Sequence, residues 1–536
     1  MFKYQPHFPY KIIRPAQSSA IEFALETFLN SDKKYAILEA GTGVGKSAIG
    51  FTIASYLQAQ QENSNGTYYI TTQKVLQEQY VNDFKTRGMK SIKSASNFRC
   101  SYHKTKTCSE SLKELKISQD SKFKKSCSGL GCNYRGAKAD FLAAKHGVTN
   151  FPYFLMETNL SGQLQKRDLM VIDECHNTEL ELSKFVEVVV TQFFAERLLK
   201  LKVPDLKTQF QVVNWIKSDY MPKLKAAHKK MESTLEQHGL KGRMTDFISL
   251  SKKWDMLDGH LSKLTRFLEI YDKDNWIMNI VEGYGRKGKK FEFKPIDIAQ
   301  YTNDYLFNKA DKVLLMSATI MQPAAFCKLL GISKDECSFI SIPSPFPVEN
   351  RPIFTHSIGS MSRKYIEESL PVLATAVSEI LKQHANEKGI IHCHNYKIAE
   401  YLKQNIRSDR LITHENASER DKALWRHINE KEPTVLLSPS MSEGVDLKDD
   451  ASRFQILCKV PYPYLGDKLV KKRMHRWKWW YPLQTAKTIV QSVGRSIRNS
   501  EDYAVTYILD SDFERFWRKN SKVFPADFRA CIVESK

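Results

Sequence analysis

A glycine-rich turn between an apolar run and a helical pattern constrains this chain most. Residues 35–38 (YAIL) have the unbroken apolar character of a buried strand, and residues 46–57 (KSAIGFTIASYL) have the apolar spacing of a helix. The turn between them, EAGTGVGKS at residues 39–47, contains three glycines that let backbone N–H groups face inward. Strand, glycine turn and helix in this order predict a loop that binds phosphate at a helix N-terminus.

The residues of this turn have separate expected tasks in binding ATP and Mg²⁺. Lys46 would reach the β- and γ-phosphates, and the Ser47 hydroxyl would bind Mg²⁺. Ala40 stands where such loops often begin with glycine. The simpler alternative is a glycine turn with a chance Lys-Ser pair. The backbone expected to hold phosphate oxygens belongs to Gly41, Thr42, Gly43 and Gly45.

A segment upstream of the turn offers contacts to the nucleotide base. Arg14 and Gln17 precede a helical pattern with apolar residues at Ile21, Leu25 and Phe28. A glutamine amide can recognise the adenine edge because it carries both a donor and an acceptor. We expect Arg14 and Gln17 to bind the nucleotide, and an ordinary polar helix start is the alternative.

A pair of carboxylates follows a second buried run. Residues 169–172 are apolar and lead directly into Asp173-Glu174-Cys175-His176. Parallel sheets place catalytic groups at the carboxyl ends of their strands. We expect Asp173 to hold Mg²⁺ through water, Glu174 to polarise the attacking water, and His176 to sense the γ-phosphate. Ser317 and Thr319, after an expected strand at residues 312–316, would couple this site to a second domain.

The charge of the chain predicts a polyanionic partner. Lys and Arg number 81 against 60 Asp and Glu, a net charge of +21, which on a nucleotide-binding chain favours nucleic acid. A basic surface with no dedicated partner is the alternative. Thr71, Thr72 and Gln79 follow an expected strand and could donate to a nucleic-acid backbone, although polar residues at a strand end are also ordinary turn chemistry.

The most basic aromatic stretch is LVKKRMHRWKWWYPLQ at residues 469–484. Cationic side chains beside flat rings bind single strands without sequence preference, through phosphate contacts and base stacking. Some of these rings would instead belong to the core. The expected strand-binding residues are Lys471, Arg473, Arg476, Trp479, Trp480 and Tyr481.

Four of the ten cysteines cluster in a Lys- and Ser-rich segment, residues 91–140, with weak periodicity. Their spacing, C-x7-C-x18-C-x4-C, lacks the paired C-x2-C of most zinc fingers. Zinc and an iron–sulfur cluster both take four cysteines, so spacing leaves both possible, and four free cysteines is the alternative to any metal. The candidate metal ligands are Cys100, Cys108, Cys127 and Cys132.

The chain has no run of about 18 apolar residues, and its N-terminal segment lacks the apolar core of a secretion signal. We therefore expect an intracellular protein, cytoplasmic or nucleoid-associated, that is neither secreted nor bound to a membrane. Residues 179 to about 270 have helical patterns. A proline-rich linker, residues 341–351, precedes a second strand–helix alternation, and Arg495 and Arg498 lie on one helix face from which both could reach a γ-phosphate.

These motifs, in this order, resemble the XPD/DinG family of superfamily 2 helicases over nearly the whole chain. The matching segments are AGTGVGKS, TTQKVLQEQ, SNFRC, CNYRGAKADF, VTNFPYFL, DECH, SAT, SPFPVENR, SEGVDL, VPYPYLGD and QSVGRSIR. The resemblance implies an α/β fold with two RecA-like parallel-sheet motor domains, and an iron–sulfur insert and a helical arch insert in the first. The expected ranges are 1–90, 141–178 and 271–345 for the first motor domain, 91–140 for the iron–sulfur domain, 179–270 for the arch, and 346–536 for the second motor domain.

The resemblance also implies an activity and further site residues. It implies an ATP-dependent helicase that translocates 5′ to 3′ on single-stranded and forked DNA, with a [4Fe–4S] cluster on the four cysteines. Its matching positions add Gly444 and Asp446 to the nucleotide site, Gln491 to the catalytic group, and Asn150 to the nucleic-acid contacts. Phe151 stands where the family often has histidine, and Cys175 where Ala or Glu is common. We expect a monomer; the alternatives are an ATP-gated clamp on single strands that does not unwind duplexes, and an RNA helicase.

Overall fold

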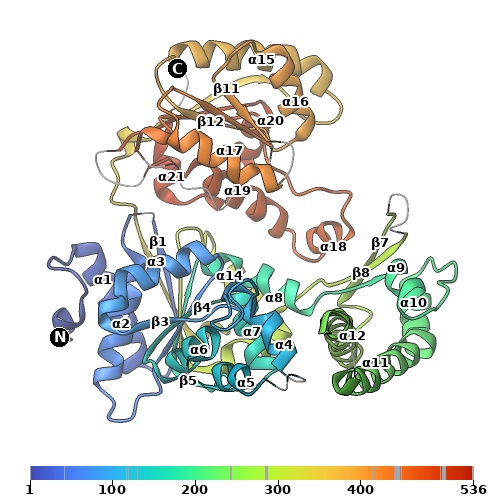
Figure 1. Ribbon diagram of the computed structural model, residues 1–536. Coiled ribbons are helices and arrows are strands. Elements are labelled where there is room, and N and C mark those ends of the chain that lie inside the picture. The colour runs from blue at the N-terminus through green and yellow to red at the C-terminus, as the bar shows by residue number, and fades with distance from the viewer. Residues whose placement is uncertain are drawn as a thin grey trace.

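Two parallel β-sheets with surrounding helices form the body of the protein (Figure 1). The computed structural model describes residues 2–41, 43–115, 118, 120–129, 131–241, 244–283, 288–414, 417–439, 447, 449–494, 496–497 and 502–533. Among these residues, every helix is too short or too polar to cross a lipid bilayer. The α/β fold with two parallel-sheet units, expected from the sequence, is confirmed.

The first α/β unit contains a seven-stranded, all-parallel sheet. Every residue of its strands β1, β2 and β4 is buried, which is typical of strands covered on both faces. The strand order is β10 (Cys337–Ile342), β1 (Tyr35–Ala40), β9 (Ala310–Ser317), β5 (Arg167–Asp173), β2 (Thr67–Thr71), β4 (His146–Asn150), β3 (Met89–Ser91). The covering helices are α1 (Pro15–Leu29), α2 (Lys46–Ala59), α3 (Lys74–Phe84), α7 (Phe151–Asn159), α8 (Thr178–Val186), α13 (Ala299–Tyr305) and α14 (Pro323–Leu330).

The strand order brings distant motifs together. Because β9 lies between β1 and β5, the turn after β1, the loop after β9 and the carboxylates after β5 end at one edge of the sheet. The expected strands at 35–38, 169–172 and 312–316 lie within β1, β5 and β9.

Two inserts interrupt this unit. The cysteine insert carries three short helices, α4 (Cys108–Leu115), α5 (Ser121–Ser128) and α6 (Asn133–Ala143). The second insert, which we call the arch, spans residues 188–295. It combines an antiparallel sheet of β6 (Val188–Thr191), β8 (Lys290–Pro295) and β7 (Trp276–Val281) with helices α9 (Gln192–Arg197), α10 (Gln209–Trp215), α11 (Met221–Lys241) and α12 (Met244–Ile270).

The arch differs in two respects from the sequence-based expectation. Residues 188–191 (VVVT) form β6 where a helical pattern was expected, because consecutive β-branched side chains favour an extended backbone. β7 and β8 pair with β6 rather than with the first sheet. Between β7 and β8, residues 284–287 lie outside the described residues.

The second α/β unit has its own seven-stranded parallel sheet. The order is β13 (Leu411–Thr413), β14 (Val435–Ser438), β12 (Gly389–His392), β15 (Phe454–Leu457), β16 (Val505–Asp510), β11 (Ile353–Gly359), β17 (Ile532–Val533). Its helices are α15 (Ile366–Gln383), α16 (Tyr396–Asn405), α17 (Ala417–Asn429), α18 (Lys468–Arg476), α19 (Trp480–Val493), α20 (Asp512–Asn520) and α21 (Ala526–Cys531).

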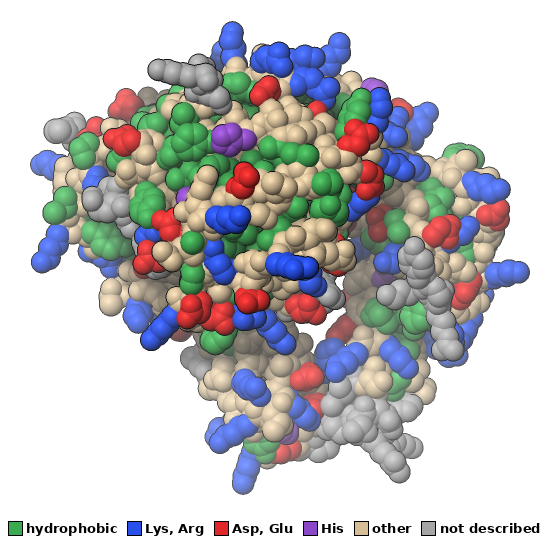
Figure 2. Space-filling view, turned by 90° about the horizontal axis from the view of Figure 1, so that it is seen from above, with side chains coloured by type: hydrophobic (Ala, Val, Ile, Leu, Met, Phe, Trp, Pro, Cys, Tyr) green, Lys and Arg blue, Asp and Glu red, His purple; other side chains and the backbone are tan. Residues whose placement is uncertain are grey.

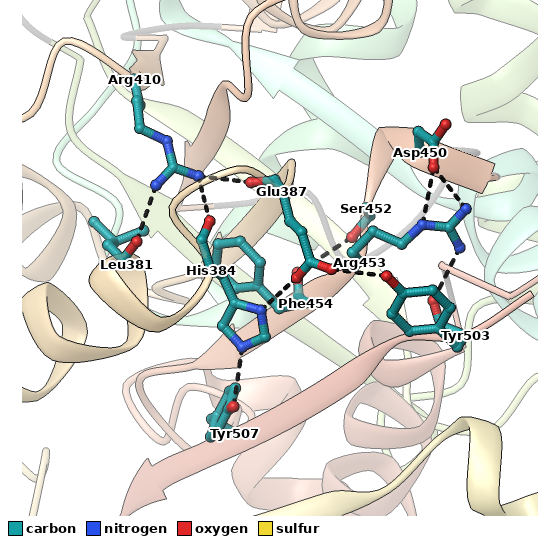
Figure 3. A network of polar contacts seen from close by, with 10 residues as sticks. All are labelled: Leu381, His384, Glu387, Arg410, Asp450, Ser452, Arg453, Phe454, Tyr503 and Tyr507. Atoms are coloured by element: carbon teal, nitrogen blue, oxygen red, sulfur yellow. Dashed lines mark hydrogen bonds and ion pairs between the residues drawn. The ribbon is translucent and has the colours of Figure 1, made fainter.

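A polar network fixes the end of α15 against this second sheet (Figure 3). The Arg410 guanidinium donates to the carbonyls of Leu381, His384 and Glu387, which lie at or just after the helix C-terminus. A cation there complements the helix dipole and satisfies carbonyls that lack helical partners. Arg453 of the same network pairs with Asp450 and Asp502.

Candidate active site

The glycine turn adopts the conformation that phosphate binding requires. Gly43 and Gly45 have φ angles of 84° and 88°, in the left-handed region that glycine favours, and α2 begins at Lys46. The Lys46 Nζ lies 3.4 Å from the Ala40 carbonyl oxygen and 3.9 Å from Glu174 Oε1. Gly41 and Ser47 lie at the two ends of the turn, and Thr42 lies outside the described residues. The turn thus places a lysine and a helix N-terminus beside the carboxylates of β5.

Arg14 and Gln17 contact the turn itself. The Arg14 guanidinium and the Gln17 amide donate to the Val44 carbonyl at 2.8 and 2.9 Å. The Gln17 carbonyl oxygen accepts the Arg14 backbone N–H at 3.0 Å. A Cβ atom at Gly45 would lie 2.6 Å from the Gln17 amide nitrogen, so the close approach also requires glycine. In this structure the pair contacts the glycine turn, and the expected binding of Arg14 and Gln17 to the nucleotide stays a prediction.

The carboxylates lie where β5 ends. Asp173 is buried, and Glu174 has a positive φ of 51°, an uncommon conformation for a residue other than glycine. Burial, and then the neighbouring Glu174 carboxylate, raise the pKa of Asp173 to about 6, against the opposing charge of Lys46. A divalent cation at this position would favour the charged carboxylate.

Tyr80 is a site residue that the sequence did not indicate. Its hydroxyl donates to Asp173 Oδ2 at 3.1 Å from the buried face of α3. Sequence reasoning selected Gln79 beside it, which is exposed. The apolar spacing of α3 was the available signal, because it places Tyr80 on the face toward the sheet.

A chain of contacts leads from His176 across the end of β9. His176 Nδ1 and Ser317 Oγ lie 2.7 Å apart, and the Thr319 N–H donates to the same Ser317 oxygen at 3.0 Å. The Gln491 amide, from α19 of the second α/β unit, lies 3.5 Å from Thr319 Oγ1. The loop after β9 therefore connects the carboxylate segment to the second unit, as the sequence predicted for Ser317 and Thr319.

Glu39 is a second site residue missed by sequence reasoning. Its carboxylate accepts the Met321 N–H at 2.6 Å and the Ser341 hydroxyl at 3.0 Å. Burial raises its pKa above the usual value. Met321 has a φ of 68°, and its side chain packs against the core of the second unit. Glu39 thus joins the strand before the phosphate loop to a strained residue at the interface between the units.

The linker between the units also contacts the phosphate loop. A Cβ atom at Gly43 would lie 2.1 Å from the Phe346 ring. Phe346 packs with Ile497 and Ala504 of the second unit. Four expected nucleotide-site residues of this unit, Gly444, Asp446, Arg495 and Arg498, lie outside the described residues. Ile497, which lies between the two arginines in sequence, packs against Phe346.

Several expected nucleic-acid residues have internal partners instead. Asn150 is buried, and its side chain accepts the Tyr153 N–H at 3.1 Å, which caps α7. Thr71 is buried and donates to the Gln73 carbonyl at 3.1 Å. Thr72 is half-buried and Gln79 exposed. Figure 2 shows Lys and Arg side chains spread around the rim of the upper face, interspersed with Asp and Glu.

The basic aromatic stretch forms α18 and the start of α19, and its buried side chains are those of Arg473, Trp477, Trp480 and Leu483. Trp480 packs with Trp477 against Leu329 of the first unit, and Arg473 is buried. A ring or guanidinium enclosed in this way is not available to a base or a phosphate, which is the physical reason to correct the expected strand-binding role of Trp480 and Arg473. Of the other expected strand-binding residues, Lys471 and Arg476 are exposed, and Trp479 and Tyr481 are half-buried.

The four clustered cysteines form one small buried core together with Phe123. Burial, and then the neighbouring thiols of Cys100 and Cys132, raise the pKa of Cys127 to about 12. The part of the chain that the structure describes contains no three His, Cys, Asp or Glu side chains gathered as ligands of one ion. Four thiols gathered in one core are nevertheless a donor set that a cationic centre would stabilise as thiolates.

Comparisons with known proteins match both α/β units. A family described as "Helicase C-terminal domain" matches residues 377–530, and one described as "Type III restriction enzyme, res subunit" matches residues 10–201. An ATP-dependent DNA helicase XPD of Sulfolobus acidocaldarius is 23% identical over 423 residues, covering 73% of each chain. A probable ATP-dependent helicase of Methanocaldococcus jannaschii is 21% identical over 614 residues, covering 94% of this chain and 92% of the relative. A solved XPD helicase structure superimposes with a TM-score of 0.62 at 16% identity, covering 96% of this chain and 98% of that one.

Proposed function

We propose that this chain, a member of the XPD/DinG-type family of superfamily 2 helicases, is an ATP-dependent DNA helicase that moves 5′ to 3′ on single-stranded DNA. One observation carries the proposal: a phosphate loop, two strand-end carboxylates and side chains of a second α/β unit meet at one sheet edge. Relatives named ATP-dependent DNA helicases support DNA as the substrate.

In the proposed mechanism, ATP occupies the phosphate loop with its γ-phosphate toward the second unit. Lys46 would stabilise charge on the β- and γ-phosphates, and Ser47 and Asp173 would hold the Mg²⁺ that neutralises part of this charge. Glu174 orients and deprotonates the attacking water, while Arg495 and Arg498 reach the γ-phosphate from the second unit. Hydrolysis removes that bridge, so the units open, and repeated closure and opening move the strand.

The interface contacts give this cycle a physical route. His176, Ser317 and Thr319 connect the carboxylate segment to Gln491, and Glu39 connects β1 to Met321. Loss of the γ-phosphate would therefore act on the second unit through a short series of contacting side chains. The proposed strand contacts are Thr72, Gln79, Lys471, Arg476, Trp479 and Tyr481.

We also propose that Cys100, Cys108, Cys127 and Cys132 bind a [4Fe–4S] cluster. Their shared burial in one small core supports a common centre, and the resemblance of the sequence to the XPD/DinG family implies the cluster rather than zinc. Such a cluster would supply cross-links that hold the insert together. It takes no part in the nucleotide chemistry proposed above.

The deciding experiment compares Lys46→Ala with an exposed lysine control, Lys519→Ala. Lys46→Ala should lower ATP turnover on the order of 10²- to 10³-fold, because it removes a cation from the developing phosphate charge, and should leave strand binding in place. The control should retain turnover. Full ATP turnover in Lys46→Ala would refute the assignment of the site.

Strand displacement decides among the remaining possibilities. Forked duplexes with a 5′ or a 3′ overhang should be separated only from the 5′ overhang. ATP turnover without displacement would indicate the clamp, and turnover stimulated by RNA but not by DNA would show that the substrate assignment is wrong.

A further inference from the structure

Helix α18 carries the second α/β unit into contact with the base of the arch (Figure 1). Arg473 lies at the centre of this contact, and its side chain is only 7% exposed. Its Nη2 donates to Glu179 Oε1 at 2.6 Å, and its Nε donates to the Ile296 carbonyl at 2.8 Å. One guanidinium therefore joins two segments of the first unit that are far apart in sequence.

These two partners lie on the two connections of the arch. Glu179 is in the first turn of α8, between the His176 segment and β6, where the chain enters the arch. Ile296 directly follows β8, where the chain leaves it. The planar guanidinium presents separate donors at fixed angles, so it can bind both connections at once, whereas a lysine ammonium is a single point charge.

Neighbouring contacts extend this interface toward the active site. Lys487 of α19 donates to the His176 carbonyl at 2.9 Å, and Lys468 donates to the Met278 carbonyl of β7 at 3.2 Å. Trp477 and Trp480 pack on Leu329 of α14. Helices α18 and α19 of the second unit thus contact two regions of the first unit: the backbone beside the carboxylates and the base of the arch.

We propose that Arg473 is a positioning residue that ties both connections of the arch to the second unit, so that nucleotide-driven movement of this unit also moves the arch. The inference rests on the proposed helicase function for its purpose. Its physical basis is the Arg473–Glu179 pair, in which the arginine side chain is 7% and the glutamate side chain 18% exposed, because removal of either partner leaves the other charge largely enclosed without its counter-ion. Strand separation then depends on Arg473 although the residue touches neither nucleotide nor DNA.

The test measures base pairs separated per ATP hydrolysed in Arg473→Ala, Glu179→Gln, the double variant and Arg473→Lys. The control is Arg515→Ala, which removes an exposed arginine of the same unit that pairs with Asp512. Each single variant should retain ATP turnover and lower the ratio by about 5- to 150-fold, the range of typical coupling between sites. The double variant should be no worse than the worse single variant, and Arg473→Lys should restore part of the ratio.

Three outcomes would overturn the proposal. The ratio could stay unchanged in Arg473→Ala, or the two single effects could multiply in the double variant. Arg473→Ala could instead weaken strand binding and its salt dependence as a phosphate contact does, which would make Arg473 a strand contact. If Arg473→Ala does not fold, Arg473→Lys and Glu179→Gln carry the test.

A second measurement separates this inference from the helicase assignment. Deuterium uptake in segments 176–187 and 290–297 should fall when an ATP analogue binds the wild-type protein, and this protection should be lost in Arg473→Lys. A wild-type protein that hydrolyses ATP but separates no strands refutes the helicase function alone. If Arg473→Lys keeps the same protection of both segments, the proposed role of Arg473 in linking the arch to the second unit is refuted.

Discussion

The cysteine insert and the arch interrupt the same unit but bury different kinds of side chain. The insert has a core of four cysteines and Phe123. The arch contributes Trp215, Phe267 and Phe291 to the hydrophobic core that also covers one face of the first sheet. An apolar core needs no ligand, whereas a few buried thiols provide little hydrophobic stabilisation. The arch therefore shares its core with the sheet, whereas the proposed cluster would supply much of the stability of the insert.

Removal of the proposed metal centre should produce the largest difference in stability between the two inserts. Chelation or oxidation of the proposed cluster should open residues 91–140, with a loss of local stability on the order of 10 kcal/mol, as in small domains whose metal binding supplies their folding free energy. The arch should keep its protection in the same sample. Hydrogen exchange followed by mass spectrometry measures both segments at once.

Cys127→Ser should reproduce this effect, and Cys337→Ser, outside the insert, should not. Anaerobically purified wild-type protein should be brown, absorb near about 400 nm and contain about four irons per chain. A colourless protein with one zinc would contradict the cluster. Cys127→Ser should also lower unwinding more than ATP turnover.

Truncation of an arch core residue should have the next largest effect. Phe291 is fully buried, with its ring centroid 6.4 Å from that of Trp215. Phe291→Ala should lower the free energy of opening of the arch by about 3–5 kcal/mol, because it removes apolar contacts and leaves a cavity. Phe210→Ala, whose ring is 73% exposed, is the matched control and should change it by less than about 0.5 kcal/mol. Equal effects of the two variants would show that the arch core is not packed as described.

Acidification should weaken the arch by a smaller amount. Burial, and then Lys263, lower the pKa of His260 to about 4, and its Nε2 lies 2.9 Å from the Tyr220 hydroxyl. Since the unfolded chain binds this proton near pH 6.5, the stability contribution is complete above that pH and is lost as pH falls toward 4. Between pH 7 and 5 the loss should be about 1–2 kcal/mol. Hydrogen exchange corrected for intrinsic rates should show it, and His260→Gln should flatten the dependence; an unchanged slope would assign it to other groups.

The smallest effect should come from the contacts between the inserts. Lys113 of α4 pairs with Asp255 of α12, and Lys252 Nζ lies 3.5 Å from Glu110 Oε1. Partly exposed pairs contribute about 0–1 kcal/mol and are screened by salt. A double-mutant cycle on Lys113 and Asp255 should give a coupling of this size that disappears at about 1 M salt. A larger coupling that persists in salt would indicate a buried interface between the inserts.

The sequence predicted the elements that depend on local pattern. The turn from Glu39 to Ser47 and the carboxylates after β5 could be placed because strand, turn and helix are specified by neighbouring residues. Tyr80 and Glu39 could not be identified as site residues, because their partners, Asp173 and Met321, are distant in sequence. Their roles follow from strand order, which no local pattern contains.

The stretch around Trp480 illustrates the opposite error. Basic and aromatic residues side by side suit a single strand, but the same composition suits an interface where rings pack and a guanidinium meets a carboxylate. Trp477 directly follows α18 and Trp480 begins α19, so the spacing of a single helix could not place them together, and only the arrangement of the two units shows that both rings meet Leu329. Composition therefore indicated an interaction surface without indicating its partner.

The contact of Phe346 with Gly43 limits how far the linker allows the two units to separate. Fully extended, the chain from Ile342 to Ile353 could span about 38 Å, but the segment from Phe346 to Ile353 could span only about 24 Å. While the ring stays on the phosphate loop, the second unit can rotate about this anchor but cannot move far from it. When the interface opens, the linker would therefore keep the two halves of the nucleotide site close together. Reclosure would then require the second unit to rotate back into place, and not to diffuse back from a distance.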